Sequence, residues 1–498
     1  QLIQALNDPL FNYKNKSLDQ RSINLLFFQL DNGEIARNRQ SAAYAKLDLV
    51  LNSSMVRLVR FIVQCDVDWE LVQEKMLTHE QSDDIAARWE MTPKQFPDQD
   101  KLITAIENGD IYAYLTSLLP MEERYRKLVK LLMNYRIMDK FPKIRYSKKS
   151  LKMGDSSSRI KEIKKRLQIT GDYPKKAPID SKFDQTLKNA VITYQKRYLL
   201  KVTGEVDRTT TYYLNQPAKN NIQAIITNLD KTKLYPKAFE NEHIEINIPD
   251  FNLRYYKDQR RVMKKGVVVG RIDRPTPLFA DAISYMVLNP TWTIPDNLIK
   301  RDLIPVLRDN PMYLEENNIQ AFRGKKKVEV TSDMLDPYEN SEKRVPFRFV
   351  QYPGDTNALG RVKFMFPNKY AVYLHDTDNK SLLNRRYKIY SSGCVRLEQP
   401  FDLVDTLLEH ARGNYSQSKI DAILESNEPT TIRLKKRIPV HIIYFTVFEE
   451  DGLAYFKNDI YLYDTIIEES VEGTKKSTFT VPEKRMISVK KNAQPLSN

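Results

Sequence analysis

The stretch from Ala371 to Pro400, AVYLHDTDNKSLLNRRYKIYSSGCVRLEQP, decides how the C-terminal half of this chain folds. The apolar segment before His375 reads as a strand, and a second strand-like segment delivers Cys394. Polar residues connect the two segments. A strand, a loop and a second strand bring both side chains to the same end of a sheet. The stretch therefore predicts a mostly β domain that presents a histidine and a cysteine at one edge.

Cys394 is one of two cysteines in the chain. A cysteine acts as a nucleophile in its thiolate form, so it needs a base or a positive field. Gly393 permits a tight turn, and the N–H groups of Gly393 and Cys394 are candidates for an oxyanion hole. Arg396 shares the face of Cys394 in a strand, where it would lower the pKa of the thiol or bind a carboxylate. These residues predict a cysteine acyl-transfer site; the alternative is a small-residue turn around a buried, inert thiol.

Histidine is the usual base for a catalytic cysteine, and the chain contains five histidines. His375 ends an apolar strand pattern just before the loop that leads to Cys394, so it is the candidate base. The sequence places His243 at a strand start, His410 at a helix end and His441 in mid-strand, where structural roles are expected.

The composition predicts a multidomain protein with packed cores, because 498 residues exceed one core and 41% of them are hydrophobic. The formal net charge of +15 favours partners rich in carboxylate or phosphate. Basic and acidic residues alternate and no nucleic-acid-binding motif occurs, so nucleic acid is not an expected partner. Cys65 lies in an apolar run and is predicted to stay buried and unpaired. No apolar run is long enough to span a membrane, and the start at Gln1 leaves open a leader or anchor ahead of it.

Hydrophobic periodicity divides the chain into five regions. Residues 1–145 read as a helical scaffold domain, residues 146–218 as a bundle of three short helices, and residues 219–242 as a connecting helix. From residue 243 to 450 the period becomes that of strands, with helices near 297–307 and after Pro400. Residues 451–498 form a C-terminal extension.

The three-helix region resembles the peptidoglycan-binding module found in many cell-wall hydrolases. The pattern of that family is F-x-x-x-T, then A-V-x-x-[FY]-Q, then T-G-x-[VIL]-D-x-x-T. The residues that meet it are Phe183, Thr186 (one residue early), Ala190, Val191, Tyr194, Gln195, Thr203, Gly204, Val206, Asp207 and Thr210. The resemblance implies binding to glycan strands, and a purely structural role is the alternative.

The residues HDT…SSGCVRL resemble the signature of the L,D-transpeptidase family, in which a histidine precedes the cysteine of [ST]-[HS]-G-C-[VI]-R by about 19 residues. Ser392 stands where many members have a second histidine. The likeness extends to the large periplasmic branch, which combines a helical scaffold, a peptidoglycan-binding module and a catalytic β domain. It implies an α+β multidomain fold and an exported protein of the periplasm.

The resemblance also implies a reaction that uses no metal and no cofactor. Cys394 attacks the third residue of a tetrapeptide stem and expels D-alanine, and His375 acts as base and then as acid. The diamino acid of a neighbouring stem resolves the thioester into a 3→3 cross-link, while water gives carboxypeptidase activity. Carbapenems are the expected inhibitors. The alternatives are a non-catalytic scaffold that binds the cell wall and an L,D-carboxypeptidase or endopeptidase that trims stem peptides.

Further substrate-binding candidates surround this pair. Arg396 and Ser392 flank the cysteine in sequence, and Tyr373 shares a strand face with His375. Trp292, in NPTWTIP, is a candidate wall of the cleft, with simple strand packing as its alternative. Asn357, in GDTNALGR, is a weaker candidate that also suits a loop-structuring role. The insertion at residues 296–344 resembles a lid over the cleft, and a surface loop is the alternative.

Overall fold

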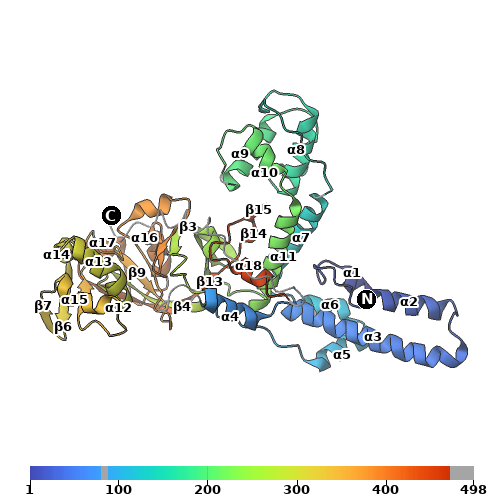
Figure 1. Ribbon diagram of the computed structural model, residues 1–498, viewed down its shortest axis with the longest axis horizontal. Coiled ribbons are helices and arrows are strands. Elements are labelled where there is room, and N and C mark those ends of the chain that lie inside the picture. Colours follow the sequence, from blue (N-terminus) through green and yellow to red (C-terminus); the bar gives the residue numbers. More distant parts are fainter. Residues whose placement is uncertain (80–87, 139, 199, 472–498) are drawn as a thin grey trace. The chain divides into compact units, whose positions relative to one another are not determined.

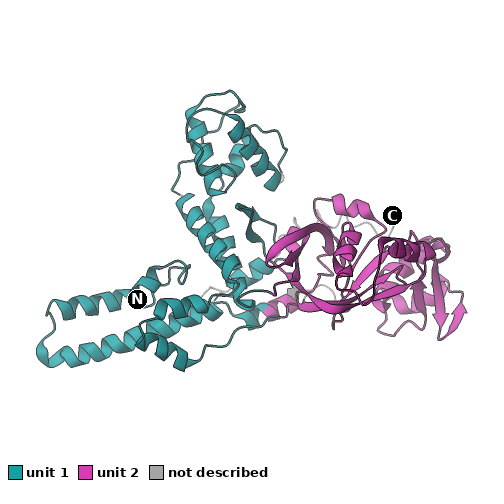
Figure 2. Cartoon of the chain, turned by 180° about the vertical axis from the view of Figure 1, so that it is seen from behind, with its two compact units in different colours: residues 1–72, 91–239, 445–474 teal, residues 73–90, 240–444, 475–498 magenta. Residues whose placement is uncertain are grey.

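The computed structural model describes residues 1–79, 88–138, 140–198 and 200–471, and the chain forms two compact units (Figure 2). Among the described residues, unit 1 holds 1–72, 91–239 and 445–471, and unit 2 holds 73–79, 88–90 and 240–444. The predicted α+β multidomain fold is confirmed, because unit 1 is mainly helical and unit 2 mainly β.

The N-terminal part of unit 1 is helical, as the periodicity predicts (blue to cyan in Figure 1). Its helices are α1 (Leu2–Asn7), α2 (Gln20–Asp31), α3 (Arg37–Gln64), α4 (Trp69–His79, which continues into unit 2), α5 (Gln99–Glu107), α6 (Ile111–Ser117) and α7 (Glu122–Met138). Tyr125, Leu128 and Leu132 form a fully buried stripe on α7 at helical spacing. Pro120 lies between α6 and α7, since proline cannot continue a helix.

The predicted bundle consists of α8 (Ser158–Ile169), α9 (Gln185–Arg197) and α10 (Arg208–Leu214). The motif residue Asp207 caps α10, since its side chain accepts a hydrogen bond from the Thr210 N–H at 2.6 Å. The cap of α8 is Ser157, whose side chain accepts a hydrogen bond from the Arg159 N–H at 3.3 Å. The helices enclose one apolar core.

Gln195 explains why the module needs its Q and T-G positions. Its side chain is fully buried, and its Oε1 accepts hydrogen bonds from the N–H groups of Thr203 and Gly204, both at 2.9 Å. Its Nε2 donates to the Thr210 hydroxyl at 3.1 Å and to the Glu205 carbonyl at 2.9 Å. A buried amide must be satisfied in this way. The motif residues therefore hold the module together, which is the structural reading of the pattern.

The chain continues through α11 (Ala218–Lys231) and the 3₁₀ turn η1 (Thr232–Leu234) into unit 2, and it returns to unit 1 at residue 445. The returning segment forms β14 (Val447–Glu450), β15 (Leu453–Phe456) and α18 (Tyr463–Glu468). We predicted that the catalytic domain would end at 450 and that an extension would follow. The structure instead assigns residues 445–471 to unit 1, and the rest of the predicted extension lies outside the described residues.

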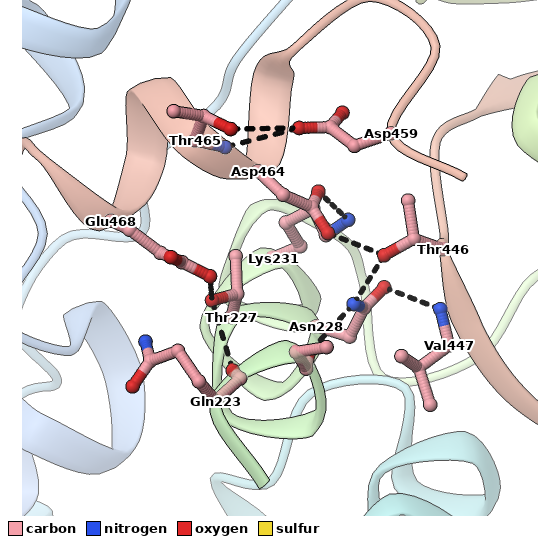
Figure 3. Close-up of polar contacts among 11 residues, drawn as sticks. Gln223, Thr227, Asn228, Lys231, Thr446, Val447, Asp459, Asp464, Thr465 and Glu468 are labelled. Carbon is pink, nitrogen blue, oxygen red and sulfur yellow. Dashed lines mark hydrogen bonds and ion pairs between the residues drawn. The ribbon is translucent and has the colours of Figure 1, made fainter. Parts of the chain in front are cut away.

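A buried polar network attaches the returning segment to α11 (Figure 3). Lys231 Nζ lies 2.6 Å from Asp464 Oδ1, and the Lys231 side chain has no exposed surface. Asp464 also accepts a hydrogen bond from the Thr446 hydroxyl. The Asn228 Nδ2 donates to the Thr446 hydroxyl at 2.7 Å, while its Oδ1 accepts from the Val447 N–H at 3.2 Å. Both ends of the inserted β domain are thus anchored within unit 1.

Unit 2 is built on a nine-stranded sheet with the order β11-β3-β12-β10-β9-β4-β13-β1-β2, and β2 also pairs with β3. The sheet therefore closes on itself like a barrel. Its strands are β1 (His243–Asn247), β2 (Asn252–Lys257), β3 (Arg260–Gly270), β4 (Ala280–Leu288), β9 (Val362–Met365), β10 (Leu374–His375), β11 (Ile389–Ser391), β12 (Val395–Leu397) and β13 (Thr430–Ile443). The helical elements beside it are η2 (Ile248–Asp250), η4 (Lys380–Asn384), α16 (Pro400–Leu408) and α17 (Gln417–Ser426).

The predicted insertion is a folded subdomain with its own apolar core, centred on Ile304, Leu335 and Phe349. Its four-stranded sheet has the order β5-β8-β6-β7. The elements are β5 (Trp292–Thr293), α12 (Asp296–Leu298), the π-helical turn η3 (Ile299–Leu303), α13 (Ile304–Asp309), α14 (Tyr313–Glu316), β6 (Ile319–Arg323), β7 (Lys326–Val328), α15 (Ser332–Glu339) and β8 (Arg348–Gln351). No helix in the described part of the chain is both long and apolar enough for a membrane span.

The Lys231–Asp464 pair gives a stability prediction. Removing one partner leaves a buried charge without compensation, so Lys231→Met or Asp464→Asn should each cost about 3–5 kcal/mol of the free energy of unfolding of unit 1. The double variant Lys231→Met/Asp464→Leu should cost less than the two single changes together. Urea unfolding followed by the circular dichroism of the helices measures this. Glu123→Gln, which breaks an exposed pair with Lys127, serves as the control and should cost under about 1 kcal/mol; equal losses in all variants would contradict the prediction.

Candidate active site

Two short parallel strands bring the predicted site residues together. β10 pairs with β12 so that Leu374 lies beside Val395 and His375 beside Arg396. The Val395 N–H donates to the Tyr373 carbonyl at 3.1 Å, which extends the pairing by one residue. Side chains alternate along a strand, so Tyr373 and His375 share one face of the sheet with Cys394 and Arg396.

Lys363 adds a second cation to this face. β9 runs antiparallel to β10 and pairs Lys363 with His375. The Lys363 Nζ lies 5.9 Å from the centre of the Tyr373 ring, and that ring meets the His375 ring edge-on with centroids 5.6 Å apart. The charges of Lys363 and Arg396 both act on Cys394. We name these five residues the site face: Lys363, Tyr373, His375, Cys394 and Arg396.

The Cys394 thiol is protonated at neutral pH. Burial raises its pKa, while hydrogen bonds from Tyr373 and the charges of Arg396 and Lys363 lower it without cancelling the effect of burial. The Tyr373 hydroxyl is the hydrogen-bonding side chain at the sulfur, and burial together with Cys394 raises the pKa of that phenol. A thiol in this state needs a base when it reacts.

His375 is buried and neutral. Burial, followed by the charge of Arg396, lowers its pKa to about 3. Its Nδ1 has no hydrogen-bond partner among the described residues. No hydrogen bond joins His375 to Cys394 in the described part of the chain. The two side chains are diagonal neighbours, offset by two residues or about 7 Å along the strands. Asp376 points away from the ring, since its carboxylate accepts the Arg361 N–H at 2.9 Å.

The turn before Cys394 uses one of the two N–H groups predicted to form the oxyanion hole, that of Gly393. Gly393 has a φ of +113°, which glycine adopts without strain. Its N–H donates to the Ser391 hydroxyl at 3.2 Å, and that hydroxyl donates to the Cys394 carbonyl, so the Gly393 N–H is already used. The Cys394 N–H has no partner among the described residues and remains the candidate donor. Ser391, which none of the sequence motifs singles out as a site residue, shapes this turn.

Of the remaining candidates, the structure brings Arg396 and Trp292 to the site. Arg396 is on the site face, and its Nη1 donates to the Thr377 hydroxyl at 3.3 Å. Burial lowers its pKa. The Trp292 side chain makes a polar contact with the Tyr373 hydroxyl that lowers the pKa of the phenol. Trp292 also packs against the core of the insertion, so it links that subdomain to the site face.

Ser392 and Asn357 have structural partners. The Ser392 hydroxyl accepts a hydrogen bond from Arg274 Nη1 at 3.0 Å. Asn357 has no exposed surface, and its amide donates to the carbonyls of Pro290 at 3.1 Å and Tyr352 at 2.9 Å. A fully buried, satisfied amide cannot contact a substrate, so Asn357 is a loop-structuring residue rather than a substrate-binding one.

Lys363 is a residue of the site face that the sequence motifs do not single out. It is a half-buried lysine between the buried Val362 and Phe364 of GRVKFMF. A basic residue between apolar residues of a strand is unusual, and this pattern was the signal in the sequence that could have identified Lys363. Burial lowers its pKa, and its Nζ donates to the Thr291 carbonyl at 3.3 Å.

The second cysteine belongs to a different cluster. Cys65 is buried and unpaired, as predicted, and burial raises its pKa. Ligand atoms of Cys65, Asp66 and Asp230 lie within 4.8 Å of one another in the described part of the chain. Lys14 Nζ lies 2.8 Å from Asp230 and also pairs with Asp66, and Lys16 Nζ lies 2.8 Å from Asp66. These lysines already neutralise the carboxylates.

Comparison with known proteins finds family matches for three regions of the chain. Residues 241–432 match the family described as "L,D-transpeptidase catalytic domain", residues 156–214 match "Putative peptidoglycan binding domain", and residues 2–132 match "Scaffold domain". A "Putative L,D-transpeptidase" of Haemophilus influenzae is 35% identical over 245 residues, which cover 49% of each chain. The chain thus spans about half the length of the curated relative that it matches.

Solved structures of L,D-transpeptidases from Xylanimonas cellulosilytica and Stackebrandtia nassauensis are 12% and 14% identical to this chain. The alignments cover 60% and 61% of this chain and 100% and 96% of those chains, with TM-scores of 0.19 and 0.20. Similarity at this level adds no weight to the family matches.

The chain thus combines a closed β domain, which carries a cysteine and a histidine on one face, with a region that matches a peptidoglycan-binding domain. More particularly, residues 241–432 match the catalytic domain of the L,D-transpeptidase family.

The lowered pKa of His375 gives a pH prediction. Its neutral imidazole stabilises unit 2 fully above the ordinary pKa of 6.5, and this contribution is lost as the pH falls toward about 3. Between pH 7 and about pH 4.5 the parent protein should therefore lose about 2–3 kcal/mol more unfolding free energy than a His375→Asn variant. The fluorescence of Trp89 and Trp292 reports unfolding of unit 2 in a Trp69→Phe background. Parallel losses in both proteins would show that His375 is not buried as a neutral ring.

Proposed function

We propose that this protein is a cysteine L,D-transpeptidase that forms 3→3 cross-links in peptidoglycan. The observation that carries the proposal is the site face, where a thiol, an imidazole and two cations meet within the matched catalytic domain. The thiol supplies the nucleophile and the imidazole a base. The cations suit a substrate that bears carboxylates, as the stem peptides of peptidoglycan do.

The acylation step transfers one proton and exchanges one bond. Cys394 loses its proton to His375 as its sulfur attacks the carbonyl carbon of the third stem residue. The Cys394 N–H is placed to stabilise the oxyanion. The C–N bond to D-alanine then breaks, the leaving amine takes the proton from His375, and a thioester remains. A neutral imidazole with an unbonded Nδ1 suits this role, because it is free to accept the proton.

The second step releases the enzyme. An amine of the diamino acid on a neighbouring stem attacks the thioester carbonyl, the C–S bond breaks, and the thiol regains its proton. Water in place of the amine would give a shortened stem instead. Products from two different stem peptides distinguish these outcomes, since only transpeptidation joins them.

The electrostatics of the module support a role in binding the anionic wall. No acidic residue of the described module falls in the most exposed class, although the side chains of Asp180 and Asp184 keep 43% and 38% of their surface exposed. The acidic residues are Asp155, Glu162, Asp172, Asp180, Asp184, Glu205 and Asp207. Several are used internally: Asp184 and Asp207 cap helices, and Asp172 pairs with Arg197. Most of the lysines are exposed. The surface of the module is therefore cationic. We propose that the protein acts in the cell envelope, as an exported enzyme of the periplasm.

A first test of the proposal is covalent capture at Cys394. The parent protein should release D-alanine from a tetrapeptide stem and form a stoichiometric carbapenem adduct, measured by intact-mass spectrometry. Cys394→Ala should do neither, and His375→Ala should be slower by about 10²-fold or more because the base is lost. Cys65→Ala is the control and should behave like the parent, since Cys65 lies in unit 1. Release of D-alanine by Cys394→Ala would exclude this nucleophile, and a protein that forms no adduct would be a non-catalytic wall-binding scaffold.

A second test concerns the module. Retention of the full chain on isolated peptidoglycan should fall between about 0.1 M and about 1 M salt, because exposed charges are screened. Replacing Lys161, Lys175 and Lys176 with glutamine should reduce retention several-fold at low salt. The control replaces Lys325, Lys326 and Lys327 of the β6–β7 hairpin, which removes the same charge from unit 2. Equal retention of the two variants would refute a charge-based role for the module.

A further inference from the structure

Arg274 is a buried arginine that the proposed reaction does not use. It lies in the connection between β3 and β4 and is 4% exposed. Its Nη1 is 2.6 Å from Asp302 Oδ2 and 3.0 Å from the Ser392 hydroxyl, and its Nη2 is 3.1 Å from Asp302 Oδ1. One guanidinium thus contacts both the insertion and the turn that carries Cys394.

The two partners of Arg274 come from separate parts of unit 2. Asp302 lies in η3 of the insertion, where its side chain is 15% exposed. Ser392 immediately precedes Gly393 and Cys394. Asp302 and Ser392 are 90 residues apart in the sequence. Arg274 therefore joins two segments that do not share a helix or strand.

The loop that holds Arg274 is itself packed against the cysteine turn. The Arg271 N–H donates to the Ser391 carbonyl at 2.9 Å, and the Gly270 N–H donates to the Thr276 hydroxyl at 2.9 Å. A Cβ at Gly270 would lie 2.2 Å from the Arg274 carbonyl oxygen, so only glycine fits where this loop closes. The backbone of the loop therefore has little freedom to shift relative to the turn.

A buried guanidinium with this bidentate partner has one preferred position. The carboxylate of Asp302 fixes its plane, and charge-assisted hydrogen bonds of this kind are directional and strong. The second bond, to Ser392, then fixes the serine hydroxyl one residue before the positive-φ glycine. A displacement of Asp302 therefore either breaks its pair with Arg274 or moves the guanidinium and disturbs its bond to Ser392.

We propose that Arg274 is a positioning residue that couples the insertion to the nucleophile, with Asp302 holding the guanidinium and the guanidinium holding the Cys394 turn through Ser392. The inference deepens the proposed function and rests on it, because it makes the rate of acyl transfer depend on the placement of η3. The insertion then acts on the reaction through a defined hydrogen-bond chain as well as through any direct contact with substrate.

The test compares the steady-state release of D-alanine by the full chain in four variants. Asp302→Asn and Ser392→Ala should each lower kcat about tenfold, the factor that corresponds to one charged hydrogen bond, with KM changed little. The double variant should be no slower than the slower single variant, because both changes break one chain. Ser392→Thr keeps the hydroxyl and should restore most of kcat.

The matched control is Asp336→Asn, which removes a partner of Arg308 elsewhere in the insertion. It should leave kcat unchanged. Losses that multiply in the double variant, an equal loss in Asp336→Asn, or no recovery in Ser392→Thr would overturn the proposal. Ser392→Ala leaves the Arg274–Asp302 pair intact, so it remains informative if Asp302→Asn fails to fold.

A second readout separates this proposal from the proposed function. Alkylation of Cys394 by iodoacetamide requires no transfer activity, and Cys65 is buried. The alkylation rate should change several-fold, and by the same factor, in Asp302→Asn, Ser392→Ala and the double variant. Asp336→Asn should leave the rate unchanged. Different factors, or no change, would overturn the coupling even if the parent protein released no D-alanine.

Discussion

The parallel pairing of β10 with β12 is the constraint on which the site depends. The hydrogen bond from the Val395 N–H to the Tyr373 carbonyl sets the register, and Cys394 then lies beside Tyr373 and Arg396 beside His375. Side chains alternate along strands, so a slip of one residue would turn the cysteine to the opposite face from the histidine. The closed sheet resists such a slip because β9 and β3 pair with the outer sides of the two strands.

This register produces an electrostatic setting with two opposed effects. Burial raises the pKa of the Cys394 thiol and lowers that of the His375 imidazole, so both groups rest in their neutral forms. Lys363 and Arg396 oppose the first effect and reinforce the second. The cysteine and the histidine of the site face therefore form no ion pair, and the two cations are placed to stabilise negative charge on the sulfur. General-base catalysis suits such a neutral pair better than a preformed thiolate.

Local patterns in the sequence predicted the parts that depend on local chemistry. The strand alternation around His375 and Cys394, the cap at Asp207 and the three-helix module all follow from nearby residues. The contacts of Lys363 depend on the pairing of β9 with β10, and Arg274 reaches residues 28 and 118 positions away. The use of the Gly393 N–H and the return of residues 445–471 to unit 1 depend on the folded backbone. Such long-range arrangements leave no periodicity in the sequence.

The register of β10 and β12 places the cations of Arg396 and Lys363 where their charges act on the Cys394 sulfur. The most direct measurement is the pH dependence of Cys394 alkylation by iodoacetamide in the parent protein and in Lys363→Met. The account predicts a midpoint at higher pH in the variant, because a cation that lowers the pKa of the thiol has been removed. A midpoint that stays the same or falls would contradict it, since Lys363 would then exert no stabilising field on the thiolate.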